Sequence, residues 1–309
     1  MFRFGIVGGG LMGHGIAVAL AEAGHRVVVH DTDPATLASL GERVVHALER
    51  CGMTAQDARV VAERVSVAPT LAELAQRSDI VVEAVSERLR VKHQVLAALE
   101  ERVSAATPIW SNTSVLSLTE VAREMRHPQR LVGVHWWNPP YVIPLVEVAP
   151  GARTDHRFVQ EACDVLDGLG KTTVRLTRDV PGFIGNRLQF ALVREALYLL
   201  EQGVCDAVTI DAVVRASLGL RWPSVGPMEN ADLIGLELTR DILSSLSPHL
   251  AASSDHFPAL DKLIRAGHRG RTTGAGLLPW PAGRDEEVSR RLETGIRYNL
   301  ASLRSRPTP

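Results

Sequence analysis

The stretch F-R-F-G-I-V-G-G-G-L-M-G, residues 2–13, decides the fold of this chain. Its apolar first half has the composition of a short buried strand, and a helical pattern follows over residues 11–23. Between the two, the glycines repeat as G-x-G-x-x-G. This spacing allows a tight turn, a close approach of the backbone to a pyrophosphate, and close packing of the helix on the sheet. The helix N-terminus would face the phosphates. We therefore expect a dinucleotide site whose cofactor-binding residues include Gly8, Gly10, Leu11, Met12 and Gly13.

The next strand supplies a second sign of a dinucleotide. The run R-V-V-V-H, residues 26–30, ends at Asp31. A carboxylate there can accept hydrogen bonds from the ribose hydroxyls of NAD, whereas it would repel the 2′-phosphate of NADP. The residues that follow, Thr32 and Asp33, provide no cation for that phosphate. The pattern therefore predicts NAD. A purely structural glycine turn and a flavin site are the alternatives, and nothing else in the chain suggests a flavin.

Short strands alternate with helices up to about residue 180, which predicts an α/β Rossmann-like doubly wound sheet. The strands expected after the second are residues 66–68, 80–84, 108–112, 130–135, 141–148 and 172–176. Only helical patterns follow the segment D-V-P-G-F-I-G-N, residues 179–186, and they include residues 207–217, 227–247, 257–267 and 285–302. We expect an NAD-binding Rossmann-like domain over residues 1–180 and an all-α substrate and dimerisation domain over residues 181–309. The last residues, 304–309, have the composition of a disordered tail.

Composition and charge exclude several classes of protein. A chain of 309 residues with 45% hydrophobic and 22% charged residues has the profile of a globular protein of about two domains. Its formal net charge of −1 gives no field that would attract nucleic acid or an anionic membrane. The longest apolar stretch, residues 190–200, contains Arg194 and Glu195, so we expect no membrane span. The three cysteines follow no metal-ligand pattern. We expect a cytoplasmic protein with free thiols and no metal.

A histidine and an acid stand out in the run G-V-H-W-W-N-P-P-Y-V-I-P-L-V-E-V, residues 133–148. His135 ends an expected strand at the carboxyl edge of the sheet, where doubly wound folds bind ligands. Histidine is also the side chain best suited to exchange a proton near neutral pH, although a lone strand-end histidine is more often ordinary. Glu147, on the next strand-like segment, is placed to hold one ring nitrogen. With Ser114 at another strand end and Asn186 in the domain junction, we expect one cleft between the domains.

Seven longer motifs occur in the chain. In order, they are G-I-V-G-G-G-L-M-G-H-G-I-A, V-V-E-A-V-S-E-R-L-R-V-K, S-N-T-S-V-L-S-L-T-E-V-A, H-W-W-N-P-P, P-L-V-E-V, D-V-P-G-F-I-G-N-R and I-R-A-G-H-R-G-R-T-T-G-A-G. Over nearly its whole length the chain thereby resembles the 3-hydroxyacyl-CoA dehydrogenase family. The resemblance implies an NAD-dependent oxidation of an L-3-hydroxy group to a 3-keto group, or the reverse reaction.

The resemblance also implies roles for four residues. His135 is implied to be the catalytic acid/base, and Glu147 to orient it. Ser114 and Asn186 are implied to contact the reacting oxygen of the substrate. In this scheme the neutral imidazole takes the proton of the 3-hydroxyl group while C3 passes a hydride to the nicotinamide.

Further contacts near the nicotinamide follow from the same resemblance. Glu87 and Lys92 match its E-x-x-x-x-K positions, and Asn112 lies within the matched S-N-T-S segment. The family also forms homodimers through the helical domain. The amphipathic pattern over residues 286–303 is accordingly expected to form a helix that packs on the partner subunit.

Three features depart from the acyl-CoA members of the family and bear on the substrate, and the third of them is the extension of about 30 residues past the Gly-rich loop at residues 270–276. Residues 50–57 lack the lysine-rich character of those members, and a CoA phosphate would favour cations there. The arginines that can substitute are Arg50, Arg59 and Arg64. The turn L-G-L-R-W-P-S-V-G-P, residues 218–227, is more similar to the lambda-crystallin/L-gulonate 3-dehydrogenase and carnitine dehydrogenase branches.

Within that turn, Arg221 can pair with a substrate carboxylate, and Trp222 can stack on a cation or an acyl group. A helix-end arginine and a buried tryptophan are equally good interpretations. The substrate therefore stays open between a 3-hydroxyacyl thioester, such as 3-hydroxybutyryl-CoA, and a small free 3-hydroxy acid of the L-gulonate or carnitine type. Two further alternatives are a non-catalytic crystallin-like NAD-binding protein and a 6-phosphogluconate-type enzyme with a lysine acid/base. The intact set of four residues argues against the first, and no lysine has the x-x-x-N spacing of the second.

Overall fold

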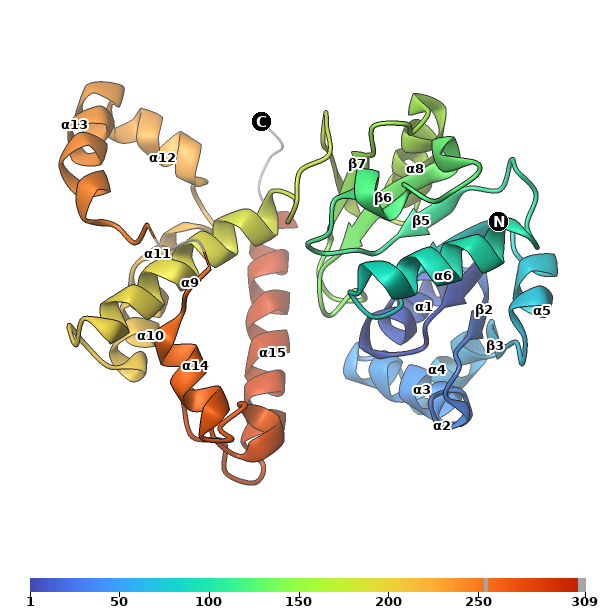
Figure 1. The fold of residues 1–309 in the computed structure, drawn as a ribbon. Coiled ribbons are helices and arrows are strands. Elements are labelled where there is room, and N and C mark those ends of the chain that lie inside the picture. Colours follow the sequence, from blue (N-terminus) through green and yellow to red (C-terminus); the bar gives the residue numbers. More distant parts are fainter. Residues whose placement is uncertain (253–254, 305–309) are drawn as a thin grey trace. The chain divides into compact units, whose positions relative to one another are not determined.

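The computed structural model describes residues 1–252 and 255–304 and divides the chain into two compact units (Figure 1). The first unit is Met1–Arg187, and the second begins at Leu188. In Figure 1 the first unit runs from blue to green and contains the sheet, whereas the second runs from yellow to red and is helical. Of the tail predicted to be disordered, residues 305–309 lie outside the described residues.

The first unit is built on an eight-stranded sheet in the order β3-β2-β1-β4-β5-β6-β7-β8. Its strands are β1 (Arg3–Val7), β2 (Arg26–His30), β3 (Val65–Val67), β4 (Ile80–Glu83), β5 (Ile109–Ser111), β6 (Leu131–Trp136), β7 (Leu145–Pro150) and β8 (Thr172–Arg175). The first six strands in that order are parallel. Strand β7 then runs antiparallel to β6, and β8 runs parallel to β7. The predicted doubly wound α/β architecture is confirmed.

Helices connect the strands of this unit. They are α1 (Leu11–Glu22), α2 (Pro34–Ala38), α3 (Leu40–Arg50), α4 (Ala55–Ala62), α5 (Leu71–Gln76), α6 (Leu89–Glu100), α7 (Leu118–Val121), the 3-10 helix η1 (Pro128–Arg130) and α8 (His156–Gly168). Several begin where the sequence provides a cap. The Asp33 carboxylate accepts the backbone N–H groups of Ala35 and Thr36 at the start of α2, and Pro34 occupies the first helical position.

The strand order gathers the sequence motifs at one edge of the sheet. Strand β1 pairs with β2 on one side and with β4 on the other, so the chain order reverses at β1. Ligands of doubly wound folds bind beyond the carboxyl ends of the strands at such a reversal. The Gly-rich turn follows β1, Asp31 follows β2, and Asn112 follows β5, so all three reach this edge.

The core of the first unit lies on both faces of the sheet. Every residue of β4, β5 and β6 is buried, which is typical of parallel strands covered on both sides. Trp110 and Trp136 are its largest fully buried apolar side chains, and the Trp110 ring centroid lies 5.6 Å from that of Phe4. The strands that carry the site are therefore held rigidly from both sides.

The strand predicted over residues 141–148 is partly wrong, because β7 begins only at Leu145. Before it, the backbone N–H groups of Val142 and Ile143 both donate to the carbonyl of Pro139, at 3.0 and 2.9 Å, and form a turn. Proline has no N–H group to donate to a strand ladder, and residues 139–144 include three prolines. Lys171 secures the turn by donating to the carbonyls of Pro140 and Ile143, at 2.7 and 3.2 Å.

The second unit is helical. Its elements are α9 (Gly185–Glu201), which begins in the last residues of the first unit, α10 (Ala207–Ala216), α11 (Leu218–Arg221), α12 (Pro227–Ile234), α13 (Leu236–Leu246), η2 (Ser247–His249), α14 (Pro258–Arg265), η3 (Arg271–Thr273) and α15 (Arg284–Arg304). The single helix predicted over residues 227–247 is wrong. Gly235, with φ of 97°, breaks it into α12 and α13, because that conformation cannot continue a helix. Among the described residues, no helix is long and apolar enough to cross a membrane.

Candidate active site

The Gly-rich turn has the geometry that its sequence predicts. Gly8 adopts φ of 102°, and a Cβ atom there would lie 2.6 Å from the carbonyl oxygen of Ala84. A Cβ atom on Gly13 would collide with the Gly8 carbonyl, so helix α1 packs closely under the turn. A Cβ atom on Gly10 would meet nothing within 4 Å. The backbone is therefore open at the position where a pyrophosphate is expected.

Asp31 and Arg43 hold this turn from the side of β2. The Asp31 carboxylate accepts the N–H of Gly9 at 2.7 Å, and its second oxygen accepts the N–H of Asp33 at 2.9 Å. Arg43, on α3, donates from Nη2 to the carbonyls of Gly9, at 2.8 Å, and Thr36, at 3.0 Å. Arg43 cannot be identified from the sequence, because an arginine on a helix carries no local signal of a contact 34 residues away.

His135 and Glu147 form the centre of the site. They are paired residues in the antiparallel register of β6 and β7, so their side chains point to the same face of the sheet. The imidazole Nδ1 lies 3.0 Å from Oε2 of Glu147, and the two residues are only 4% and 1% exposed. A carboxylate at Nδ1 favours the tautomer with the proton on that nitrogen, which leaves the lone pair of Nε2 available.

Glu147 has three further donors. Trp137 donates its indole N–H to Oε2 at 3.2 Å, while the backbone N–H groups of Ile184 and Gly185 donate to Oε1 at 2.8 and 3.1 Å. Burial alone would raise the pKa of Glu147, but the hydrogen bonds from His135, the two backbone groups and Trp137 outweigh it and hold the pKa below its ordinary value. Glu147 is therefore a carboxylate that joins the histidine to the start of helix α9.

Phe183 packs against the imidazole from the domain junction. Its ring is stacked on that of His135, with centroids 4.8 Å apart and an interplanar angle of 24°. The segment V-P-G-F has the pattern of a type II turn: Pro181 comes second, Gly182 has φ of 84°, and the N–H of Phe183 donates to the carbonyl of Val180. Phe183 itself has φ of 50°, a conformation that costs about 1–3 kcal/mol outside glycine.

That strain is offset by the packing of the same side chain. Phe183 is 2% exposed, and an aromatic pair contributes about 0.5–1.5 kcal/mol beyond its buried area. Trp137 closes the arrangement, because its ring occupies the space that a Cβ atom on Gly185 would need. The D-V-P-G-F-I-G-N segment was predicted to join the two domains, but this contact of Phe183 was not predicted. The signal that points to it is a proline–glycine turn directly before an aromatic residue.

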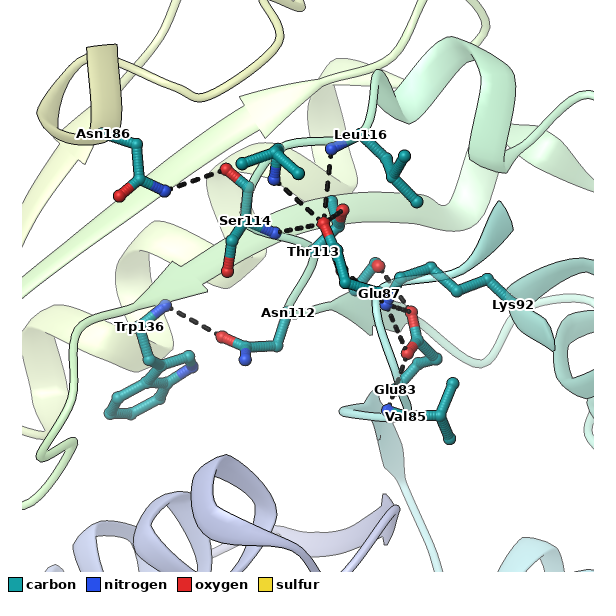
Figure 2. A network of polar contacts seen from close by, with 12 residues as sticks. Glu83, Val85, Glu87, Lys92, Asn112, Thr113, Ser114, Leu116, Trp136 and Asn186 are labelled. Carbon is teal, nitrogen blue, oxygen red and sulfur yellow. Dashed lines mark hydrogen bonds and ion pairs between the residues drawn. The ribbon is translucent and has the colours of Figure 1, made fainter. Parts of the chain in front are cut away.

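Ser114 and Asn186 also come together in the first unit. The side-chain amide of Asn186 donates to the backbone carbonyl of Ser114 at 3.0 Å (Figure 2). Ser114 lies in the loop after β5, next to Asn112, whose side-chain oxygen accepts the N–H of Trp136 at 3.0 Å. The loop is thereby linked on one side to the strand that carries His135 and on the other to the start of α9.

Glu87 gathers the same loop around one carboxylate oxygen. Its Oε1 accepts the hydroxyl of Thr113 at 2.6 Å and the backbone N–H groups of Ser114, Val115 and Leu116 at 2.8, 2.9 and 3.3 Å (Figure 2). Burial alone would raise the pKa of Glu87. The Thr113 hydroxyl, the loop N–H groups and the charge of Lys92 outweigh it, so the pKa lies below its ordinary value.

Lys92 stands behind Glu87 as a fully buried cation. Its Nζ lies 2.8 and 3.0 Å from the two oxygens of Glu83 and 3.3 Å from Oε2 of Glu87. Glu83 also accepts the hydroxyl of Ser111 at 2.6 Å. Lys92 and Glu83 are both 0% exposed, so neither side chain reaches solvent. The cofactor contacts expected of Glu87, Lys92 and Asn112 stay predictions.

The residues predicted to select the substrate lie apart from this cluster in the chain. Arg221 ends α11 in the second unit, and Trp222 follows it with 47% of its surface exposed, so the buried tryptophan of the alternative interpretation is not observed. Their contact with substrate stays a prediction. Arg64 directly precedes β3, at the amino edge of the sheet, and donates to the carbonyl of Ala21 at 2.8 Å. It therefore lies at the opposite edge from the dinucleotide turn.

Two sequence profiles match almost the whole chain. The profile described as "3-hydroxyacyl-CoA dehydrogenase, NAD binding domain" matches residues 3–180, and "3-hydroxyacyl-CoA dehydrogenase, C-terminal domain" matches residues 182–280. The chain is 35% identical over 280 residues to the probable 3-hydroxybutyryl-CoA dehydrogenase of Bacillus subtilis, covering 89% of this chain and 96% of that one. It is 37% identical over 296 residues to the L-carnitine dehydrogenase of Streptomyces griseus, covering 93% and 88%.

A third relative extends the range of named substrates. The 5-formyl-3-hydroxy-2-methylpyridine 4-carboxylate 5-dehydrogenase of Mesorhizobium japonicum is 32% identical over 279 residues, covering 88% of this chain and 89% of that one. The crystal structure of an enzyme of that name, described as an NAD+-dependent dismutase, matches with a TM-score of 0.91 and 29% identity, covering 99% of this chain and 100% of that one.

Proposed function

This chain belongs to the 3-hydroxyacyl-CoA dehydrogenase family, and we propose that it acts at C3 of a 3-hydroxyacyl thioester such as 3-hydroxybutyryl-CoA. It is an NAD-dependent oxidoreductase. In the proposed reaction it oxidises the C3 hydroxyl group to a ketone or catalyses the reverse reduction. The observation that carries the proposal is the buried His135–Glu147 pair at the carboxyl edge of the sheet, where the dinucleotide turn also ends.

The cofactor side of the site fits NAD. The open backbone at Gly10 suits the pyrophosphate, and the Asp31 carboxylate suits ribose hydroxyls while repelling a 2′-phosphate. When bound, NAD supplies the hydride acceptor for the oxidation. The turn that Gly8, Gly10 and Gly13 shape would hold its phosphates, with Gly10 at the open position, and Asp31 would hold its adenosine ribose.

On the substrate side, His135 performs the proton transfer. With its Nδ1 proton directed to Glu147, the ring presents Nε2 as a base for the 3-hydroxyl proton. The imidazolium that forms is stabilised by the adjacent carboxylate, which is already ionised because four donors surround it. In the reverse direction the same ring returns the proton. We assign the positioning of the reacting oxygen to Ser114 and Asn186, which the 3.0 Å bond between them keeps adjacent.

A small free 3-hydroxy acid, of the carnitine or L-gulonate type, is the second candidate substrate class. Two observations favour it. The carnitine dehydrogenase relative has the higher identity of the two quoted above, 37% against 35%. In addition, Arg64, one of three arginines that can replace the missing lysines of the CoA-binding hairpin, lies at the wrong edge of the sheet to reach a CoA phosphate. A non-catalytic crystallin-like role is disfavoured because the acid/base pair is intact.

A substrate panel separates these classes. NADH oxidation would be measured with acetoacetyl-CoA, and NAD+ reduction with L-3-hydroxybutyrate, L-gulonate, L-carnitine and the pyridine aldehyde named for the Mesorhizobium relative. The highest kcat/KM with acetoacetyl-CoA supports the thioester. The highest value with L-3-hydroxybutyrate, L-gulonate or L-carnitine replaces it by the second candidate. The highest value with the pyridine aldehyde, or activity on none of the five, contradicts both.

We propose that the enzyme is a homodimer formed through its helical unit. Among the described residues from Leu188 onward, Leu197 and Ala251 are the only buried hydrophobic residues. Large apolar side chains of α12 and α13 are exposed instead: Met228, Leu233, Leu236, Leu238, Ile242 and Leu243. Many exposed apolar side chains on two successive helices favour an interaction site, and a second copy of the chain presents the same apolar side chains.

Sedimentation velocity tests the dimer. The wild-type protein should sediment as a dimer, and Leu243→Asp should shift it towards the monomer. Val60→Asp, at an exposed apolar residue of the first unit, is the matched control and should leave the dimer intact. A wild-type protein that sediments as a monomer at micromolar concentration contradicts the proposal. We also propose a cytoplasmic location, which Cys163 and Cys205 support because neither forms a disulfide.

A further inference from the structure

Glu87 has an arrangement of contacts that a cofactor ligand does not need. We propose that Glu87 is a positioning residue for Ser114, whose carboxylate holds the loop of residues 112–116 in the conformation that the reaction requires. The inference rests on the proposed function, because it assumes that Ser114 contacts the reacting oxygen. It assigns to Glu87 a task beyond the cofactor contact that the family resemblance implies.

One carboxylate oxygen of Glu87 accepts four donors. Three successive backbone N–H groups, from Ser114 to Leu116, and the Thr113 hydroxyl all converge on Oε1 of Glu87 (Figure 2). Successive N–H groups that point to one centre form a concave anion site, called a nest. Here the anion is a side chain of the same chain. Because a carboxylate fills the nest, the backbone of Ser114 is fixed by bonds on both sides of its own Cα atom.

A buried cation, Lys92, also holds the carboxylate of Glu87. Lys92 has no exposed surface, and its Nζ lies 3.3 Å from Oε2 of Glu87 and within 3.0 Å of both oxygens of Glu83. The E-x-x-x-x-K spacing places Lys92 in the first turn of α6, behind the loop that carries Glu87. A buried ammonium between two carboxylates holds Glu87 by charge as well as by hydrogen bonds. Both oxygens of Glu87 therefore have partners within the chain.

The loop of residues 112–116 is hydrogen-bonded to both Trp136 and Asn186. Asn112, at its start, accepts the N–H of Trp136, the residue directly after His135. Ser114, at its centre, accepts the side-chain amide of Asn186 through its carbonyl. A shift of the loop would therefore move Ser114 relative to both His135 and Asn186. A displacement of about 1 Å in a reacting constellation can reduce turnover by about 100-fold, so the loop needs a fixed anchor.

A double-mutant cycle distinguishes this role from a cofactor contact. Ser114→Ala removes the group that Glu87 positions and should lower kcat by about 100- to 1,000-fold, the typical effect of losing one donor to a reacting oxygen. Glu87→Ala should lower kcat by a large part of that factor and leave the Kd for NADH within about twofold. In the double variant Glu87→Ala/Ser114→Ala, kcat should equal that of Ser114→Ala within about threefold. Glu87 acts through the Ser114 hydroxyl, so its loss has no further effect once that hydroxyl is absent.

Two milder variants keep the test valid if Glu87→Ala fails to fold. Glu87→Gln keeps the size of the side chain and one acceptor oxygen but loses the charge, so its kcat should lie between those of the wild type and Glu87→Ala. Thr113→Val removes one of the four donors and should have a smaller effect. Glu101→Gln is the matched control, because Glu101 directly follows α6 and its side chain is exposed beside Arg102. It should behave like the wild type.

Four outcomes decide the matter. Non-additivity with unchanged NADH affinity supports the proposal. The proposal is overturned if kcat of the double variant lies below that of Ser114→Ala by the same factor by which Glu87→Ala lies below the wild type. It is also overturned if the main defect of Glu87→Ala is weaker NADH binding. If the wild type turns over no substrate of the panel, the proposed function fails separately. Hydrogen exchange of the peptide containing residues 113–117 then decides: faster exchange in Glu87→Gln supports the anchor, and unchanged exchange refutes it.

Discussion

Glu147 joins two parts of the site through its two carboxylate oxygens. Oε2 lies 3.0 Å from Nδ1 of His135, and Oε1 accepts the N–H groups of Ile184 and Gly185, where helix α9 begins. The start of a helix carries partial positive charge, so the same carboxylate is stabilised from the side opposite to the histidine. The orientation of the His135 ring is thus set by strands β6 and β7 together with the junction segment.

Removing the Glu147 charge should change how the stability of the protein depends on pH. The pKa of Glu147 lies below its ordinary value of 4.5 in the folded protein. The unfolded chain therefore binds a proton at higher pH than the folded one, and the stabilisation is present above about pH 4.5 and lost as pH falls further. The difference in free energy of unfolding between the wild type and Glu147→Gln should shrink from about pH 5 to pH 3. Urea titrations at several pH values measure it, and a difference that stays constant or grows would refute the lowered pKa.

The stacking of Phe183 on His135 should matter for turnover more than for cofactor binding. One hydrogen bond to Glu147 fixes a point on the imidazole, whereas a stacked ring fixes its plane. Phe183→Leu should therefore lower kcat by about 10-fold and leave the Kd for NADH unchanged, while Phe183→Tyr, which keeps the ring, should retain most of the activity. Stopped-flow measurement of the first turnover gives the rate of the chemical step. Equal rates for Phe183→Leu and the wild type would mean that the ring only fills space.

Replacing Lys92 should destabilise the first unit strongly. Its removal leaves the buried carboxylate of Glu83 and the partly exposed carboxylate of Glu87 without their cation. Breaking a buried ion pair from one side costs about 3–5 kcal/mol, so Lys92→Met should lower the free energy of unfolding by that amount. Lys262→Met, at an exposed lysine of α14, is the matched control and should stay within about 0.5 kcal/mol of the wild type. A loss below about 1 kcal/mol for Lys92→Met would show that the two carboxylates are satisfied in another way.

Asp31 should control the choice between the two nicotinamide cofactors. Its carboxylate lies beside the Gly-rich turn, 2.7 Å from the N–H of Gly9. Asp31→Asn removes the charge that repels a 2′-phosphate but keeps the size of the side chain. The ratio of the Kd for NADPH to that for NADH should fall by about 10-fold or more, which corresponds to about 1.4 kcal/mol. Titration of cofactor fluorescence measures both constants, and an unchanged ratio would place the source of selectivity elsewhere.

The sequence was sufficient for the parts of the fold that depend on local signals. Alternating apolar runs and helical patterns predicted the doubly wound sheet, and the G-x-G-x-x-G turn predicted the open backbone that Gly10 provides. It failed where several weak local signals compete. Strand β7 begins at Leu145, after the prolines, and not at residue 141. Gly235 separates α12 from α13, although the apolar pattern continues through it.

Contacts between distant segments could not be read from the sequence. The E-x-x-x-x-K motif draws attention to Lys92. The residues around it in the sequence do not indicate that its side chain is fully buried between two carboxylates. The stack of Phe183 on His135 joins residues 48 positions apart and needs a left-handed backbone that phenylalanine rarely adopts. His135 and Glu147 were different, because adjacent strands of one sheet bring them into register.

The role of His135 is the central claim, and one comparison tests it most directly. NADH oxidation by the wild type and by His135→Gln would be measured with the best substrate of the panel, alongside the Kd for NADH. Loss of the acid/base group predicts a fall in kcat of at least about 100-fold with NADH affinity unchanged within about twofold. If His135→Gln turns over at the wild-type rate, the proton passes through another group and the account of the site is wrong.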